Sequence, residues 1–253
     1  MKIVIAPRFN HLAGFLESLP NRFDVEGKTL NDKRNVIKLF HVDGLDIVVK
    51  RFRKPLWVQR IAYTFFRKTK AERAFLYGTE LVSRGFLTAP SMAYLEHKSN
   101  GLMDDCYYVC GFDPNPPIEE LTDQPIQDRG LIEDFSLFVK ELHCKGILHH
   151  DLNCSNVLYH LQSDGHYAFS LIDNNRMMFY PQGEMPPLDE CMENLTRFTG
   201  DMGLFRSVAE SYCRVRRLPE GSVEKMMEVK RAHDEKYSRR KRMKAKLRKK
   251  RKD

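Results

Sequence analysis

The stretch ILHHDLNCSNVLYH, residues 147–160, sets two histidines, an aspartate and two asparagines between apolar flanks. The flanks, Ile147-Leu148 and Val157-Leu158, have the length and character of short buried strands. A surface loop would account for the polar residues but not for these flanks. We therefore predict a tight turn between two strands that are anchored in a core, with its polar side chains presented to a cleft.

The segments around this turn predict an α+β chain. Residues 35–52 predict a hairpin, because two apolar runs flank Asp43-Gly44, a strong turn signal. Strands are also predicted over 106–112 and, as a pair, over 167–180; helices are predicted over 9–19, 70–85, 131–146, 188–217 and 222–250. Because strands dominate the first half and helices the second, we expect a two-lobe α+β architecture.

Positive charge is concentrated at the C-terminal end. Residues 231–253 contain 13 Lys and Arg against 3 Asp and Glu, whereas residues 1–230 contain 29 against 31. This tail is either a solvated helix or arm, or it docks on a polyanion such as anionic lipid or nucleic acid. Because it has few apolar residues to bury, we expect its removal to leave the fold and the chemistry on a soluble acceptor nearly unchanged.

A second basic segment, residues 50–73, contains nine Lys and Arg against one Glu. Trp57, Ile61 and Phe65 recur every four residues between its basic residues. A basic amphipathic helix with a tryptophan is typical of a segment that lies in a membrane interface. The alternative is that this apolar stripe packs on the body of the protein.

Four residues have the chemistry that phosphoryl transfer from a nucleotide requires. Asp151 and Asn156 stand in an H-x-D-x-x-x-x-N spacing, Asp173 ends the apolar run FSLID, and Lys50 ends the run LDIVVK. A cation must hold the inner phosphates, oxygen ligands must hold Mg²⁺, and a carboxylate must deprotonate the acceptor hydroxyl. Lys50, then Asn156 with Asp173, then Asp151 can fill these roles in that order.

The same residues resemble a known family. Their order and spacing are those of the protein-kinase-like superfamily, and HHDLNCSNVL with LIDNNRM is similar to the motifs of the lipopolysaccharide kinase (Kdo/WaaP) family. The resemblance covers roughly residues 25–215. It implies a two-lobe kinase-like fold with a small β-rich N-lobe over 1–112, a larger mostly helical C-lobe over 113–222 and a basic helical tail over 223–253.

The resemblance also implies site residues, with ATP and Mg²⁺ as cofactors. Asp151 is expected to be the catalytic base and Asn156 and Asp173 the metal ligands. The ATP lysine is Lys50, its ion-pair partner is Glu72, with Glu80 as the alternative, and the adenine is held near Cys110–Phe112. No G-x-G-x-x-G precedes Lys50, so Lys33 and Arg34 in the loop KTLNDKRN are candidates for holding phosphate, or else they belong to a solvated hairpin tip.

The implied function is ATP-dependent phosphorylation of a lipopolysaccharide core sugar, Kdo or heptose, on a glycolipid acceptor. No apolar run reaches the length of a membrane span, and we expect a cytoplasmic enzyme held peripherally at the inner face of the bacterial inner membrane. One alternative is an atypical serine kinase that acts near the ribosome, with the tail on RNA. Another is a catalytically inactive kinase-like protein.

The histidines near the turn are assigned different roles. His149 is expected to position the turn through hydrogen bonds rather than to act as a base. His143 and His160 are expected to be ordinary polar residues of the surface. The six cysteines have neither a C-x-x-C pair nor metal-ligand spacing, and we expect reduced thiols.

Overall fold

The structure is a computed structural model that describes residues 1–122 and 129–249. It divides into two compact units: the first is Met1–Pro114 with Ser170–Arg176, and the second is Asn115–Phe169 with the chain from Met177 onward. The predicted lobes, 1–112 and 113–222, do not include this return of residues 170–176 to the first unit. The return has a local cause, because Ser170 and Leu171 pair with a strand of the first unit.

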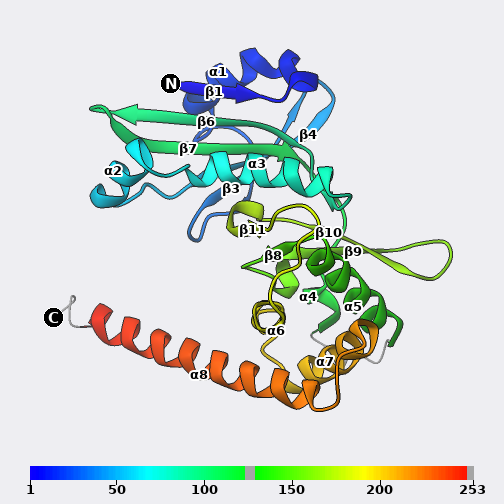
Figure 1. The fold of residues 1–253 in the computed structure, drawn as a ribbon. Helices are drawn as coiled ribbons and strands as arrows, with labels where there is room; N and C mark the ends of the chain where they lie inside the picture. Colours follow the sequence, from blue (N-terminus) through cyan, green and yellow to red (C-terminus); the bar gives the residue numbers. More distant parts are fainter. Residues whose placement is uncertain (123–128, 250–253) are drawn as a thin grey trace. The chain divides into compact units, whose positions relative to one another are not determined.

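The first unit is built on an antiparallel sheet of six strands in the order β1-β6-β7-β4-β3-β2 (Figure 1). The strands are β1 (Lys2–Ile5), β2 (Lys28–Asn31), β3 (Val36–Val42), β4 (Leu45–Phe52), β6 (Ser91–Ser99) and β7 (Leu102–Gly111). A short strand, β5 (Leu87–Thr88), pairs in parallel with the end of β10 (Tyr167–Leu171).

Each face of the six-stranded sheet has its own apolar core, because successive side chains of a strand point to opposite faces. Ile47 and Val49 of β4 pack in one core with Leu16 of α1 (Ala13–Arg22). Phe52 of the same strand packs in the other core with Ala74 of α3 (Lys70–Ser83). The predicted helix over 9–19 is formed by a 3₁₀ helix, η1 (Pro7–Leu12), followed by α1.

The predicted hairpin over 35–52 is confirmed. Strands β3 and β4 pair in antiparallel register from Val36↔Arg51 to Val42↔Leu45. The two turn residues, Asp43 and Gly44, have φ values of 51° and 76°. A two-residue turn of this hand needs positive φ at both positions, which is why Asp-Gly is favoured there.

The predicted helix over 70–85 is also confirmed, as α3. Thr69 caps its first turn by accepting a hydrogen bond from the Glu72 amide at 3.1 Å. The helix ends just before Gly85, whose φ is 89°. Within α3, a side chain at Gly78 would collide with the hydroxyl of Ser91 on β6. Glycine therefore lets α3 lie directly on the sheet, next to the strand that carries Lys50.

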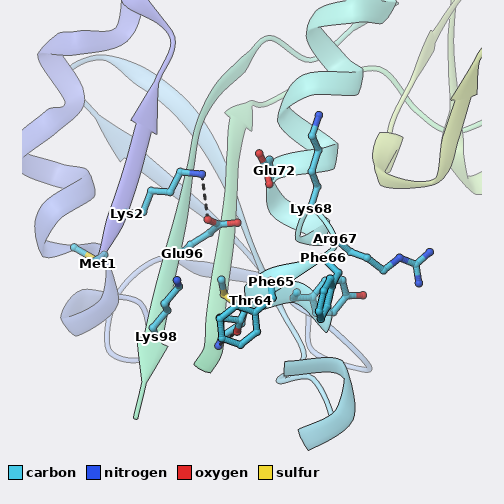
Figure 2. Close-up of a pocket in the computed structure, with 12 residues that line it drawn as sticks. Met1, Lys2, Thr64, Phe65, Phe66, Arg67, Lys68, Glu72, Glu96 and Lys98 are labelled. Atoms are coloured by element: carbon cyan, nitrogen blue, oxygen red, sulfur yellow. Dashed lines mark hydrogen bonds and ion pairs between the residues drawn. The ribbon is translucent and has the colours of Figure 1, made fainter. Parts of the chain in front are cut away.

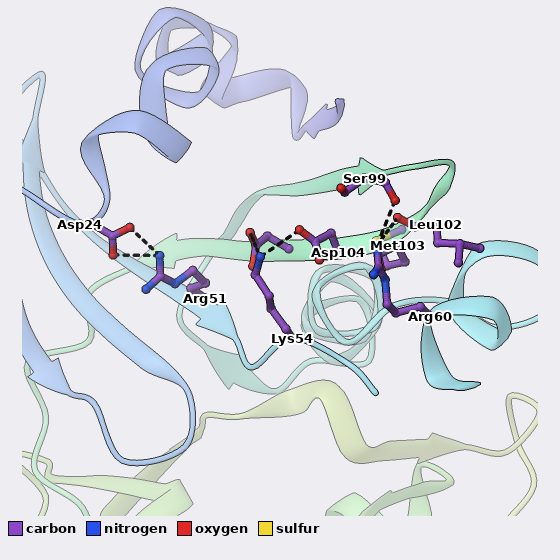
Figure 3. Close-up of polar contacts among 9 residues, drawn as sticks. Asp24, Arg51, Lys54, Arg60, Ser99, Leu102, Met103 and Asp104 are labelled. Atoms are coloured by element: carbon purple, nitrogen blue, oxygen red, sulfur yellow. Dashed lines mark hydrogen bonds and ion pairs between the residues drawn. The ribbon is translucent and has the colours of Figure 1, made fainter. Parts of the chain in front are cut away.

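Helix α2 (Trp57–Phe65) is held to the sheet by polar contacts (Figure 3). The Arg60 guanidinium donates to the carbonyl oxygens of Met103 at 2.7 Å and Ser99 at 2.9 Å. The apolar stripe predicted for this segment does not pack on the body at its ends, because Trp57 is 71% exposed and Phe65 is 67% exposed. The helix therefore presents its aromatic side chains to its surroundings.

The second unit is mostly helical, as predicted. Its helices are α4 (Glu119–Thr122), α5 (Arg129–Cys144), α6 (Leu188–Leu195), α7 (Met202–Arg216) and α8 (Ser222–Lys249); its strands are β8 (Ile147–His149), β9 (Val157–Leu161) and β11 (Met177–Phe179). The pair predicted over 167–180 forms β10 and β11, which pair with other strands rather than with each other, since β11 pairs with β8.

The core of the second unit forms around α5. Phe135 stacks on Phe198 with ring centroids 4.1 Å apart and meets Phe169 edge-on at 5.8 Å. Leu131 and Leu142 of the same helix are also buried. This core fixes the end of α5, and the chain then enters β8 and the turn with the polar residues.

Helix α8 is longer and more firmly attached than a solvated tail. It runs for 28 residues, and Met226, Met227 and Lys230 in its first half are buried. From Glu235 to Met243 the side chains are exposed. The predicted tail, 223–253, therefore begins inside an element that packs on the second unit, because its first turns carry apolar residues. Within the described residues, no helix is both long enough and apolar enough to cross a membrane.

Candidate active site

The turn after β8 holds Asp151 and Asn156 together through its own hydrogen bonds. The side-chain amide of Asn156 donates to the carbonyl oxygen of Asp151 at 2.9 Å. The side chain of Asn153 accepts from the Ser155 amide at 3.1 Å and so caps the 3₁₀ helix η2 (Cys154–Asn156). Within the described residues the Asn156 side-chain oxygen accepts no hydrogen bond, so it is available for a cation. The predicted tight turn between two strands, β8 and β9, is confirmed.

His149 positions this turn, as predicted. It is fully buried, and its Nδ1 accepts a hydrogen bond from the Asp151 amide at 3.1 Å. Its carbonyl oxygen accepts from the side-chain nitrogen of Asn194 on α6 at 2.7 Å. The base of the turn is therefore tied to a neighbouring helix.

His143 corrects the prediction of a surface residue. It is fully buried, and its ring nitrogens contact the Tyr212 hydroxyl at 2.6 Å and the Asn194 side-chain oxygen at 3.1 Å. Burial lowers the pKa of His143 from 6.5 to about 4. A relay of hydrogen bonds thus runs from Tyr212 through His143, Asn194 and His149 to the Asp151 amide. The pattern of residues along α5 does not indicate that His143 is buried, because its hydrogen-bond partners come from α6 and α7.

Lys50 and Asp173 meet in the first unit. The Lys50 ammonium lies 2.6 Å from a carboxylate oxygen of Asp173, and the two side chains are 11% and 29% exposed. Asp173 has a φ of 58°, a left-handed conformation that is uncommon in residues other than glycine, although aspartate tolerates it better than most. The side chain of Asn175 also contacts its carboxylate. Strained backbone of this kind gathers at functional sites, where surrounding contacts hold it in place.

The loop after Asp173 is held by β5. The side-chain nitrogen of Asn174 donates to the Thr88 hydroxyl at 2.9 Å, and this hydroxyl donates to the Leu171 carbonyl at 2.6 Å. The 3₁₀ helix η3 (Asn174–Arg176) packs against α3. These contacts place Asp173 beside Lys50 through elements of the first unit alone.

The two glutamates considered for Lys50 lie elsewhere. Glu72 lines a pocket of about 600 Å³ with Lys2 and Glu96, which form an ion pair at 3.4 Å (Figure 2). Glu80 forms an ion pair with Arg84 at 2.7 Å. Among the residues that the structure describes, Asp173 is the carboxylate that it brings to Lys50, and neither glutamate is.

Two further cations that the sequence interpretation missed lie in this region: Lys70 is near enough to Lys50 for their charges to interact, and Arg73 is near Lys70. Burial lowers the pKa of Lys70, and the nearby charges of Arg34, Arg73 and Lys50 lower it further. The Nε of Arg73 is buried and has no hydrogen-bond partner in the described part of the chain. A cluster of cations creates a positive electrostatic potential that favours the binding of an anion. Lys70 and Arg73 both lie in the first turn of α3. Two basic residues three positions apart are the sequence pattern that could have indicated them.

The first half of KTLNDKRN is strand β2 (Lys28–Asn31), and its second half forms the tip between β2 and β3. Lys33 and Arg34 are exposed there, and the Lys33 amide donates to the Asn31 side chain at 3.0 Å. Arg34 is near enough to act on the charge of Lys70. The structure therefore brings Arg34 near Lys70.

The segment predicted to hold adenine, Cys110–Phe112, forms the end of β7 and the residue after it. Cys110 pairs within the sheet with Val48 and Ser91. The Phe112 amide donates to the Asp46 carbonyl at 3.0 Å, so this amide is engaged inside the first unit. A nucleotide base would have to use other backbone groups of this segment.

Residues 38–179 match the model of the lipopolysaccharide kinase (Kdo/WaaP) family. A solved structure described as "WaaP in complex with acyl carrier protein" matches with a TM-score of 0.61 at 18% identity, covering 90% of this chain and 97% of that chain. No curated protein matches. The structural likeness confirms the predicted kinase-like fold.

Proposed function

The chain belongs to the lipopolysaccharide kinase (Kdo/WaaP) family, and from this premise we propose that it transfers the γ-phosphate of ATP to a hydroxyl of a lipopolysaccharide core sugar, Kdo or heptose. The observation that carries the proposal is the Lys50–Asp173 ion pair at 2.6 Å. The other two proposed site residues, Asp151 and Asn156, also lie inside the matched range. The family makes the protein a kinase, and the finer assignments below are our proposal.

Lys50 is proposed to bind the inner phosphates of ATP. An ammonium on a central strand is a point charge suited to phosphate oxygens. Lys70 and Arg73 add positive charge beside it, and the unpaired Nε of Arg73 is a donor without an acceptor in the described residues. These cations compensate for the missing glycine-rich loop, because they can reach phosphate where a non-glycine backbone cannot approach.

Asp173 of the first unit and Asn156 of the second are each proposed as a ligand of Mg²⁺, because Mg²⁺ prefers carboxylate and amide oxygens and substrate phosphates. When bound, the ion neutralises charge that develops on the phosphates. In the present structure Asp173 contacts Lys50, and within the described residues the Asn156 side-chain oxygen accepts no hydrogen bond. Both residues therefore offer the right type of donor.

Asp151 is proposed to be the general base. As the acceptor oxygen forms its bond to the γ-phosphorus, the hydroxyl proton passes to the Asp151 carboxylate and the bond to the ADP oxygen breaks. The Asp151 amide donates to His149 and the Asp151 carbonyl accepts from Asn156, so the backbone is fixed on both sides of this carboxylate. A rigid backbone favours in-line transfer, because small errors of position are costly.

Attachment to the inner face of the inner membrane is proposed for two surfaces. One is α2, whose exposed Trp57, Phe65 and Phe66 stand near Arg67 and Lys68. The other is the exposed basic end of α8. Aromatic and basic residues together suit the interface of an anionic bilayer.

The test is phosphate transfer from labelled ATP to extracted glycolipid, compared with a generic protein and with a ribosome fraction. We expect glycolipid to be labelled, and Asp151→Ala to lose about 10²–10⁴-fold in rate while it still binds ATP. Labelling of the ribosome fraction alone would favour the serine-kinase alternative. ATP binding without transfer to any fraction would favour the inactive alternative.

A further inference from the structure

A cavity of about 480 Å³ lies within the second unit and has Asp151 in its wall. Its remaining lining comes from the turn, from the segment between α6 and α7, and from α8: Asn153, Thr196, Arg197, Thr199, Gly200, Lys230, His233, Asp234, Tyr237 and Ser238. The proposed base therefore faces a cavity to which the C-terminal helix contributes about half of the lining residues.

The α8 side of the cavity is held in place. Lys230 is only 1% exposed, forms an ion pair with Asp234 at 2.8 Å and lies over the Phe205 ring at 5.6 Å. His233 contacts the same carboxylate at 3.1 Å. Because Met226 is buried one turn earlier, this part of α8 is a fixed wall rather than a loose tail.

The lining has the composition of a site for a polyhydroxylated anion. Hydroxyls of Thr199, Tyr237 and Ser238 and the Asn153 amide can exchange hydrogen bonds with sugar hydroxyls. The charge of Lys230 is already balanced by Asp234. Arg197 is half-buried, and within residues 1–122 and 129–249 no carboxylate forms an ion pair with it. The Arg197 guanidinium is therefore the group suited to bind a carboxylate or phosphate on the ligand.

We propose that this cavity is the acceptor subsite: it binds one sugar unit that carries a carboxylate or phosphate, with Arg197 on the anionic group and α8 as the outer wall. This rests on the proposed function, because it places the reacting hydroxyl at Asp151. The α8 residues lie beyond the family match, which ends at residue 179. Selection of the acceptor is thus assigned to a part of the chain outside that match.

The first experiment measures binding without chemistry. A de-acylated lipopolysaccharide core oligosaccharide is titrated into the full-length protein by calorimetry, in its native form and after removal of its phosphates. Arg197→Gln and Tyr237→Ala should each weaken binding, the former by about 10- to 100-fold for a lost charge-assisted pair. Arg231→Gln, exposed on the same helix and outside the lining, is the matched control and should bind normally. A loss of binding on removal of phosphates identifies phosphate as the anion; unchanged binding identifies a carboxylate.

The second experiment measures phosphate transfer to the oligosaccharide, so that failure of the acceptor subsite can be told apart from failure of the proposed kinase function. The cavity variants should raise KM for the oligosaccharide and leave ATP affinity unchanged. Transfer that proceeds with the same KM in Arg197→Gln and Tyr237→Ala would overturn the subsite and leave the kinase function standing. If no transfer occurs, binding that both variants abolish still supports the subsite, and binding that neither changes overturns it.

Discussion

Acidification tests the buried relay behind the catalytic turn. His143 is fully enclosed between Tyr212 and Asn194. Asn194 donates through its nitrogen to His149, so its oxygen must accept from the Nε2–H of His143. The Nδ1 then accepts from the Tyr212 hydroxyl, whose oxygen accepts from Arg216 at 2.8 Å. A proton added to Nδ1 would place a second donor and a positive charge in a site built for the neutral ring.

The sign and size of the effect follow from the two pKa values of His143, 6.5 as the ordinary value and about 4 when folded. Below the ordinary value the unfolded chain binds a proton that the folded chain refuses, so acid favours unfolding. The stability that the neutral His143 ring contributes is fully present above the ordinary pKa. It is lost as the pH falls towards the pKa of the folded state. The difference between the two pKa values corresponds to a change of about 3 kcal/mol in the free energy of unfolding over the full pH range. Between about pH 7 and pH 4.5 the change is roughly 2 kcal/mol.

The assay is urea unfolding of the wild type, His143→Gln and His160→Gln at both pH values. Trp57, the one tryptophan, lies in the first unit, so helical circular dichroism should be used to follow the second. His143→Gln should be less stable at neutral pH, yet lose roughly 2 kcal/mol less than the wild type on acidification. His160→Gln, exposed on β9, should keep the wild-type dependence. An unchanged dependence in His143→Gln would refute the neutral relay.

Two further predictions concern the metal site and the membrane. Asp173→Asn should lower activity by about 100-fold or more, since even outer partners of metal ligands are worth 10–100-fold, and it should reduce the Mg²⁺ dependence of ATP affinity; an undiminished dependence would place the metal elsewhere. Replacing Trp57 and Phe65 together by serine should weaken binding to anionic vesicles by about 10-fold or more per buried ring. Leu161→Ser, which also removes an exposed apolar side chain, is the control and should bind normally.

Local patterns predicted the elements whose partners are near in sequence. The β3–β4 hairpin follows from Asp43-Gly44, since that dipeptide accepts the two positive φ values. The turn around Asp151 follows from its own asparagines, which cap and brace it. In each case the deciding contacts lie within a few residues, so the sequence carries the information directly.

Predictions failed where the deciding partner lies far along the chain. His143 is polar on a helix, and only Asn194 and Tyr212, 51 and 69 residues later, explain its burial. The pairing of Lys50 with Glu72 stays a prediction drawn from the resemblance; the contact that the structure shows is with Asp173, which the return of residues 170–176 brings to Lys50. The count of charged residues likewise gave no indication of the buried residues at the start of α8, because basic residues dominate the composition of the C-terminal segment.

Two truncations separate the roles of α8, and they replace the expectation that residues 231–253 are dispensable for chemistry. Cutting at residue 230 removes His233, Asp234 and Tyr237 from the cavity and leaves Lys230 without its carboxylate. An unpaired buried cation is costly, so the second unit should lose about 1–3 kcal/mol. Transfer to soluble oligosaccharide should fall steeply.

Cutting at residue 238 instead removes 11 of the 13 basic residues of the tail and keeps the cavity lining intact. Transfer to the soluble acceptor should then be preserved. Binding to anionic vesicles should weaken, because each basic residue near the bilayer adds about 1 kcal/mol, and this loss should shrink as salt screens the charges. Equal activity of both truncations on the soluble acceptor would remove α8 from the acceptor site. Tail-dependent binding to structured RNA, with vesicles ignored, would instead assign the basic end to nucleic acid, because phosphates of either polymer or lipid attract the same charges.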